Sequence, residues 1–175
     1  MGIITNYRNP LRGKIRDYET YFDKNLKDSF DPRKIVTDLT CMDSINKPAK
    51  AWWGSPVGAK FGWKEWCEAE EFGIERYDFD SEPIRWGLKD GSSIFVIDTE
   101  DIADIDNPNN LIVHYTSRED GNHLDFQRIL DDGIIAIELA NSSIGHMFMN
   151  KYELMFNCWD CESIVVLDPQ SIVWY

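Results

Sequence analysis

Four of the seven tryptophans in this 175-residue chain fall within the short segment Ala51–Phe72. They are Trp52, Trp53, Trp63 and Trp66, and a Gly-Ser-Pro sequence follows the first pair. Trp is the largest side chain, and a buried indole N–H needs a hydrogen-bond partner. Such a dense group predicts one of two arrangements: a tightly packed structural corner or a pocket with aromatic walls.

Periodicity divides this tryptophan-rich segment. The spacing over Gly62–Phe72 predicts a helix with Trp63, Trp66 and Cys67 on one face, which we expect to be core. The segment Ala51–Trp53 is predicted to be a strand, in which neighbouring side chains point to opposite faces. Only one of its two tryptophans can therefore face a cavity.

The composition favours a packed domain. Hydrophobic residues make up 43% of the chain and aromatic residues 13%, which is typical of a globular protein. Turns and isolated helices follow one another irregularly, so we expect an α+β fold of small mixed sheets and packed helices. We assign residues 35–175 to this single domain and residues 1–34 to an N-terminal helical segment.

Apolar spacing and turn residues predict the order of the elements. Helices are expected at Tyr18–Leu26, Gly62–Phe72, Leu124–Leu130 and Ile144–Phe156. Strands are expected at Ile35–Leu39, Ala51–Trp53, Ile74–Asp80, Ile84–Leu88, Ile94–Ile97, Leu111–Tyr115, Ile134–Leu139, Ser163–Leu167 and Ile172–Tyr175. The turns at Lys89–Ser92 and Asp168-Pro169 predict that the strands on either side of each turn pair as hairpins.

The charge balance bears on possible partners. The formal net charge is −13, which disfavours binding to a nucleic-acid backbone. It is typical of a soluble protein, or of an acidic surface that docks on a basic protein target. No apolar run approaches the ~20 residues of a membrane span, and the first residues lack a secretion signal. We therefore expect a cytoplasmic protein without membrane contact.

The four cysteines stand at positions 41, 67, 158 and 161. Because we expect a cytoplasmic protein, we expect reduced thiols. Cys158 and Cys161 form one C-x-x-C pair, whereas a zinc site needs a second pair at matched spacing. We interpret the pair as structural and predict no metal.

The sequence contains no common metal, phosphate-binding or serine-nucleophile motif. The chemistry that remains is a carboxylate where a strand begins. Glu162 follows Trp159 closely, and strand alternation places it in line with Ile164 and Val166. A partly desolvated carboxylate there suits the stabilisation of an oxocarbenium-like centre, although it could equally end the strand in solvent. Glu138, near the end of an earlier predicted strand, is a second candidate.

Three segments carry a resemblance to a known family: Asn46–Pro48 leading to Trp52–Pro56, the helix start Gly62–Cys67, and the terminal strands within Trp159–Tyr175. Together they resemble the ADP-ribosyltransferase fold, and more narrowly its small bacterial and phage members with a Trp-rich second motif. In that fold a strand ending in a Ser-containing motif shapes the nicotinamide pocket. A Glu at the start of a later strand contacts the nicotinamide ribose.

The resemblance implies a mono-ADP-ribosyltransferase that uses NAD as its substrate and modifies a host protein or nucleic acid. Trp52 and Trp53 would wall a slot for nicotinamide, Ser55 would form a hydrogen bond nearby, and Glu162 would stabilise the ribosyl cation. The chain departs from the family in Lys34–Thr40, which lacks the Arg or His that grips the dinucleotide, and in having Gly-Ser-Pro for Ser-Thr-Ser. Two alternatives stay open: a non-enzymatic acidic binding or inhibitor protein, and an inactive relative that binds a ligand.

Overall fold

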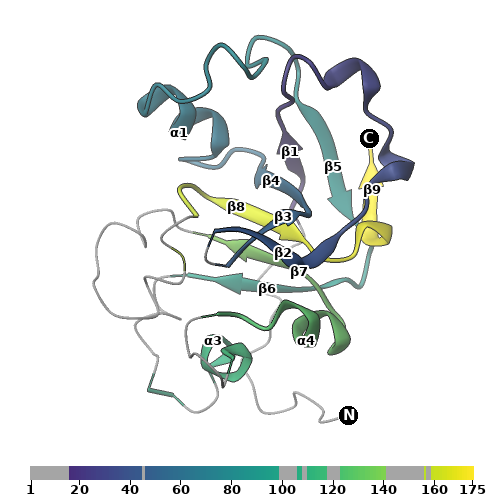
Figure 1. The fold of residues 1–175 in the computed structure, drawn as a ribbon, viewed down its shortest axis with the longest axis vertical. Coiled ribbons are helices and arrows are strands. Elements are labelled where there is room, and N and C mark those ends of the chain that lie inside the picture. The colour runs from purple at the N-terminus through teal and green to yellow at the C-terminus, as the bar shows by residue number, and fades with distance from the viewer. Residues whose placement is uncertain are drawn as a thin grey trace.

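The computed structural model describes residues 16–44, 46–98, 106–107, 110–117, 123–140, 156 and 159–175. They form a single α+β domain built on a seven-stranded sheet with the strand order β6-β7-β8-β4-β1-β5-β9 (Figure 1). The strands are β1 Tyr18–Thr20, β4 Trp52–Pro56, β5 Ile84–Leu88, β6 Ser93–Ile97, β7 Ile134–Leu139, β8 Ser163–Val166 and β9 Ile172–Trp174. A separate two-stranded sheet pairs β2 Asp38–Ser44 with β3 Lys47–Lys50.

Strand β4 joins the two halves of the large sheet. Its first three residues pair with β8, with Gly54 opposite Ile164, whereas Ser55 and Pro56 pair with β1. In Figure 1, β6, β7 and β8 run across the view, while β1, β5 and β9 run along it. The change of direction occurs over β4, so the sheet is bent at this strand.

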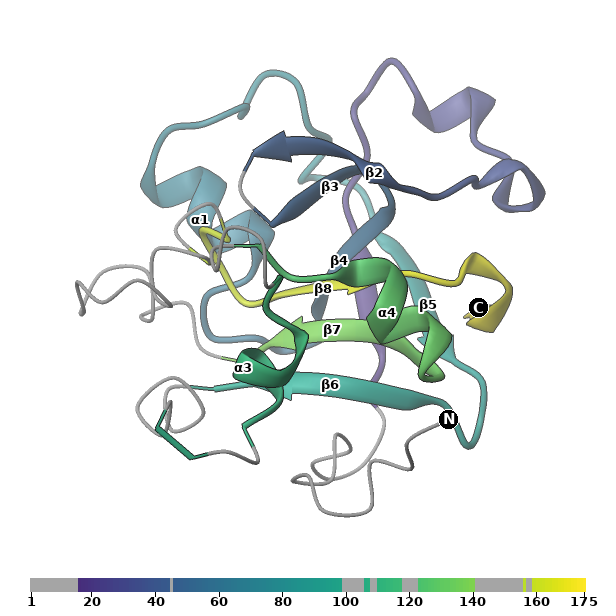
Figure 2. The same cartoon turned by 60° about the horizontal axis from the view of Figure 1, so that its bottom comes forward.

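The two faces of the sheet carry two hydrophobic clusters. Helices α3 Leu111–Tyr115 and α4 Phe126–Asp131 cover one face and pack against β6, β7 and β8 (Figure 2). On the other face, Tyr18 and Trp86 pack with Ile164 and Val166, inside the bend of the sheet. Each face of the central strands is thus buried, which explains why β8 is entirely apolar after Ser163.

Short helices complete the described part of the chain. Helix α1 Trp63–Ala69 follows β4, and the 3₁₀ helices are η1 Lys27–Ser29, η2 Pro32–Lys34 and η3 Pro169–Ser171. No helix among the described residues is long and apolar enough to cross a lipid bilayer.

The strands expected at Ile84–Leu88, Ile94–Ile97, Ile134–Leu139, Ser163–Leu167 and Ile172–Tyr175, and the helices at Gly62–Phe72 and Leu124–Leu130, are confirmed within a few residues at each end. The strand expected at Ala51–Trp53 extends through the Gly-Ser-Pro sequence to Pro56. The strand expected at Ile35–Leu39 begins later, at Asp38, and the one at Ile74–Asp80 is reduced to one bridge between Tyr77 and Asp23. The helix expected at Ile144–Phe156 lies outside the described residues, apart from Phe156.

The helix predicted at Tyr18–Leu26 is wrong. Tyr18–Thr20 is strand β1 in the middle of the large sheet, so residues 16–34 belong to the same domain. The side chain of Tyr18 is buried inside the bend of the sheet. The spacing of Tyr18, Tyr21 and Leu26 matches the period of a helix only by coincidence. The strand predicted at Leu111–Tyr115 is also wrong, because this segment is α3, capped by the Asn110 side chain on the N–H of Ile112.

Both predicted hairpins are wrong as well. The turn after β5 leads to β6, but β5 pairs with β1 and β9, whereas β6 pairs in parallel with β7. Likewise, β8 pairs with β4 and β7, and β9 lies at the far edge beside β5. The short turns connect strands in different halves of the sheet, because the bend at β4 brings those halves close together.

Candidate functional site

A cleft of about 530 Å³ lies where β1, β4 and the start of β8 meet α1. Six aromatic side chains line it: Tyr21, Trp53, Trp63, Phe72, Tyr77 and Trp159. The tryptophan-rich segment therefore forms a packed corner and part of a cavity wall at the same time.

The N-terminus of α1 is fixed to β4 by side-chain capping. Ser55 Oγ accepts a hydrogen bond of 3.0 Å from the N–H of Trp63, and Glu65 Oε2 accepts one of 3.0 Å from the N–H of Gly62. Two of the N–H groups that a helix start leaves unpaired are satisfied in this way. A Cβ on Gly62 would lie 3.1 Å from Ser55 Cβ, so glycine allows this close approach. Ser55 thus places Trp63 at the cleft.

Trp63 belongs to a stack of rings. Its ring lies on that of Trp66, with centroids 5.2 Å apart and an interplanar angle of 21°. Tyr77 and Phe72 contact it edge-on, at centroid distances of 5.5 and 6.1 Å. Trp66 is not among the residues that line the cleft, so it packs against the side of Trp63 that faces away from the cavity.

Trp53 is held in one orientation from two sides. Its indole N–H donates a hydrogen bond of 3.0 Å to the Pro48 carbonyl oxygen on β3. Its ring meets that of Trp159 edge-to-face, at a centroid distance of 4.9 Å. Trp159 is almost fully buried and donates its own indole N–H to the Asn46 carbonyl oxygen at 2.8 Å. Both indole N–H groups are therefore paired, which fixes the orientation of the two rings.

Three ion pairs involve charged groups that line the cleft. Glu19 Oε2 lies 3.4 Å from Arg85 Nη2, and Arg76 Nε lies 2.7 Å from Asp23 Oδ2. Lys47 Nζ is 4.0 Å from the carboxylate of Asp160. Burial raises the pKa of Glu19, and the nearby Arg85 opposes this rise. Glu19 is a carboxylate of this cavity that sequence reasoning missed.

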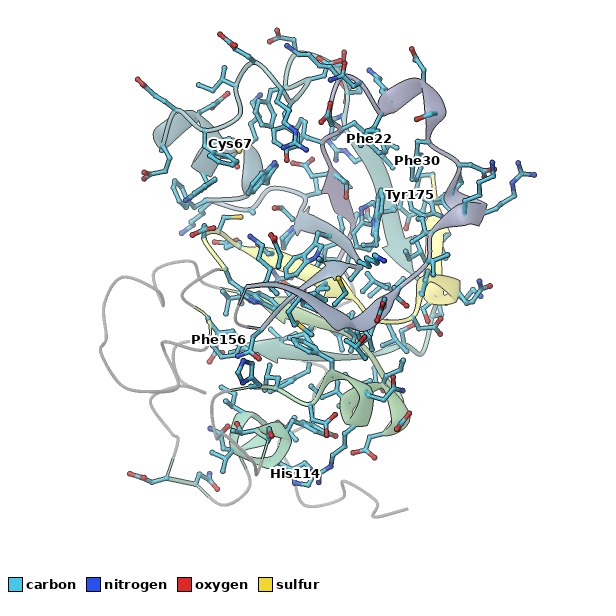
Figure 3. All side chains as sticks on the ribbon, viewed as in Figure 1. Phe22, Phe30, Cys67, His114, Phe156 and Tyr175 are labelled. Atoms are coloured by element: carbon cyan, nitrogen blue, oxygen red, sulfur yellow. The ribbon has the colours of Figure 1, made fainter. Side chains whose placement is uncertain are left out.

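The structure separates the predicted site residues. Trp53 and Ser55 line the cleft together, but Trp52 points to the opposite face and packs among Phe30, Trp86 and Trp174. Figure 3 shows Phe30, one member of this second aromatic group, close to Tyr175 at the end of β9 and away from Cys67 of α1. The indole nitrogen of Trp52 is buried and has no hydrogen-bond partner among the described residues.

Glu162 also does not line the cleft. Its backbone N–H donates to the Phe61 carbonyl oxygen at 3.0 Å, which ties the entry of β8 to the loop before α1. Burial raises the pKa of its carboxyl group, Arg16 lowers it and Glu138 raises it. These last two residues belong to the other face of the sheet, where Ile164 and Val166 lie.

Glu138 is the most deeply buried carboxylate among the described residues, with 2% exposure. The Tyr18 hydroxyl donates a hydrogen bond of 2.8 Å to its Oε2 atom. Its Oε1 atom makes no hydrogen bond of good geometry, but Arg16 Nη1 lies 3.1 Å away, so the charge is paired. Burial raises the pKa of Glu138, while Arg16 and the Tyr18 hydrogen bond oppose the rise.

Two cysteines of the described part of the chain, Cys67 and Cys161, are buried and poorly reactive. Burial raises the pKa of Cys67 to about 12 and that of Cys161 to about 11, so both thiols stay protonated near neutral pH. Cys158, the partner of Cys161 in the C-x-x-C pair, lies outside the described residues. Within the residues that are described, no three His, Cys, Asp or Glu side chains are grouped to hold a metal ion.

Sequence reasoning missed Glu19, Arg76 and Tyr77. The alternation of Tyr18, Glu19 and Thr20 could have revealed Glu19, because a strand places it on the face opposite the buried Tyr18. Nothing in the sequence around Arg76 marks its position, since the loop that carries it reaches the cleft only through the fold.

Comparison with known proteins adds no family to these observations: the chain matches no protein-family model, no curated protein and no solved structure.

Proposed function

We propose that the cleft binds the planar ring of a nucleotide-class ligand, with the nicotinamide ring of NAD as the first candidate. The observation that carries the proposal is the aromatic lining of a cavity of about 530 Å³. This volume lies within the range of pockets that hold small ligands and cofactors. Rigid indole faces bind planar rings by stacking, at about 1–3 kcal/mol for each base in nucleic-acid complexes.

Arg76 supplies a feature expected of a nucleotide site. Its ion pair with Asp23 uses Nε, and its terminal nitrogens make no hydrogen bond to a residue in the described part of the chain. Its guanidinium lies over the ring of Tyr77, at 5.6 Å from the centroid. An arginine held beside an aromatic cavity suits recognition of a phosphate group attached to the bound ring.

Transfer of ADP-ribose is the catalytic form of this proposal. The bond between ribose C1′ and the nicotinamide nitrogen would break, and nicotinamide would leave with the electron pair. The acceptor atom of the target would bond to C1′ and lose a proton. A carboxylate beside C1′ stabilises the cation in this step. Because Glu162 does not line the cleft, the geometry supports binding better than transfer.

Isothermal titration of the full chain with NAD, nicotinamide mononucleotide and AMP tests the proposal. We expect saturable binding of at least one of them, weakened about tenfold or more by Trp63→Leu. Trp174→Leu is the matched control, because Trp174 is also partly buried but belongs to the opposite face. The absence of binding by all three ligands, or equal weakening by both variants, would contradict the proposal.

A separate assay addresses catalysis. The protein is incubated with NAD and a bacterial lysate, and nicotinamide release and ADP-ribose addition are followed by mass spectrometry. Turnover that disappears in Glu162→Gln would assign the transfer step to the residue indicated by the family resemblance. Binding without turnover would identify a ligand-binding protein.

A further inference from the structure

The carboxylate of Glu19 lines the cleft and accepts no hydrogen bond from a described residue. It lies on β1, between Ser55 of β4 and Arg85 of β5, and faces the cavity. Its ion pair with Arg85 is 3.4 Å long and does not have hydrogen-bond geometry, and no other residue of the described chain donates to it. The side chain is 17% exposed, so it is partly shielded from solvent.

Such a group calls for a donor from the ligand. A hydrogen bond to a carboxylate is charge-assisted and strong, and an ionised carboxylate is an acceptor only. The Trp53 indole N–H does not serve as this donor, since it is used on the Pro48 carbonyl oxygen. An N–H group on the edge of a ring bound in the cleft can supply the missing donor.

We propose that Glu19 selects the bound ring by accepting a hydrogen bond from an N–H group on its edge. The cleft then takes rings that carry a carboxamide and rejects the same rings when they carry a carboxylate, because two carboxylates would repel each other. This inference rests on the proposed binding of a nicotinamide-type ring, and it assigns to Glu19 the choice between amide and acid.

Nicotinamide mononucleotide and nicotinic acid mononucleotide provide the matched pair of probes, because they differ only in this group. Titration of the wild-type protein with both is expected to show a preference for the amide of about tenfold or more, as for a hydrogen bond to a charged group. In Glu19→Gln the preference is expected to disappear, because a glutamine amide can donate to the carboxylate of nicotinic acid.

Asp90→Asn is the control, since it removes one negative charge in the turn after β5, away from the residues that line the cleft. It is expected to keep the preference of the wild type. Equal binding of the two probes by the wild type, a preference that survives in Glu19→Gln, or its loss in Asp90→Asn would each overturn the inference while ring binding stands. Binding of neither probe would remove the proposed function together with it.

Discussion

The hydroxyl group of Tyr18 on β1 donates a hydrogen bond of 2.8 Å to Glu138 Oε2 on β7. Two strands, β4 and β8, separate β1 from β7 in the order of the sheet. A flat sheet would hold these strands about 14 Å apart, at the usual strand spacing. The contact is therefore possible only because the sheet bends at β4, and it locks the two halves of the sheet together.

Removal of this hydrogen bond should destabilise the fold. Tyr18→Phe leaves a buried carboxylate oxygen without its donor, which costs about 1–3 kcal/mol of the free energy of unfolding. Urea denaturation measures the loss. Tyr175→Phe is the control, because Tyr175 donates to Asp17 at 3.0 Å on the exposed surface, where the expected change is within about 0.5 kcal/mol. Similar losses in the two variants would show that the Tyr18 contact does not lock the sheet.

The buried Glu138 should make stability depend on pH in a definite direction. Its pKa is raised from the ordinary value of about 4.5, mainly by burial, so the native state binds its proton more tightly than the unfolded chain does. Its contribution to stability is complete below the ordinary pKa and is lost as pH rises through the raised value. The facing groups Arg16 and Tyr18 reduce this loss without removing the rise in pKa.

Glu138→Gln removes the titrating group and so isolates its effect. The free energy of unfolding of the variant minus that of the wild type should increase as pH rises from about 4 to about 7. Other carboxyl groups, such as Asp23, whose pKa is lowered by Arg76, cancel in this difference. Urea denaturation at several pH values provides the measurement. A difference that stays constant or falls with pH would show that Glu138 is not proton-linked in this way.

Local patterns in the sequence located most of the elements but not their partners. The apolar runs at Ile134–Leu139 and Ser163–Leu167 are bounded by turn residues, and both became strands. They pair with each other although they lie far apart in the sequence, which no local pattern records. For the same reason the sequence predicted hairpins at β5–β6 and β8–β9, where the chain instead crosses between the halves of the sheet.

In the candidate site, too, local patterns predicted some features, whereas others depend on the fold. Strand alternation predicted that only one of Trp52 and Trp53 faces a cavity, and the structure places Trp53 there. Ser55 lines the cleft as well, but its hydroxyl oxygen is committed to α1. Alternation also put Glu162 in line with Ile164. Trp53 lies opposite Val165, so the face that carries Ile164 is the one away from Trp53. Strand alternation therefore already indicated that Glu162 and Trp53 lie on opposite faces, although the family resemblance placed both in one site.

The capping role of Ser55 can be tested directly. Ser55→Ala removes the acceptor of the Trp63 N–H, with an expected cost of about 1 kcal/mol, as for other helix caps. Because α1 carries Trp63, ligand binding should weaken together with stability. Ser29→Ala is the control, since the Ser29 hydroxyl donates to the Leu26 carbonyl on an exposed turn. Thermal unfolding and titration with the best-bound nucleotide measure the two effects. Unchanged stability in Ser55→Ala would remove the capping role.

Gly54, at the bend of β4, should tolerate no side chain. A Cβ there would lie 2.7 Å from Trp86 Cζ2 and 2.8 Å from the Glu19 carbonyl oxygen, so Trp86 or β1 must move. Overpacking of this kind costs about 1–3 kcal/mol. Gly91→Ala is the comparison, because Gly91 has a φ of +79° and open space around it, so its cost of about 1–2 kcal/mol comes from the backbone alone.

The two glycine variants separate the bend from general destabilisation. A shift of β1 in Gly54→Ala would move Glu19 relative to the aromatic walls, so ligand binding should weaken by about tenfold, as for the loss of a hydrogen bond to a charged group. Gly91→Ala lies away from the cleft and should bind as the wild type does, even when its stability falls. Titration at a temperature where both variants are fully folded makes the comparison. Wild-type affinity in Gly54→Ala would show that the bend at β4 does not set the geometry of the cleft.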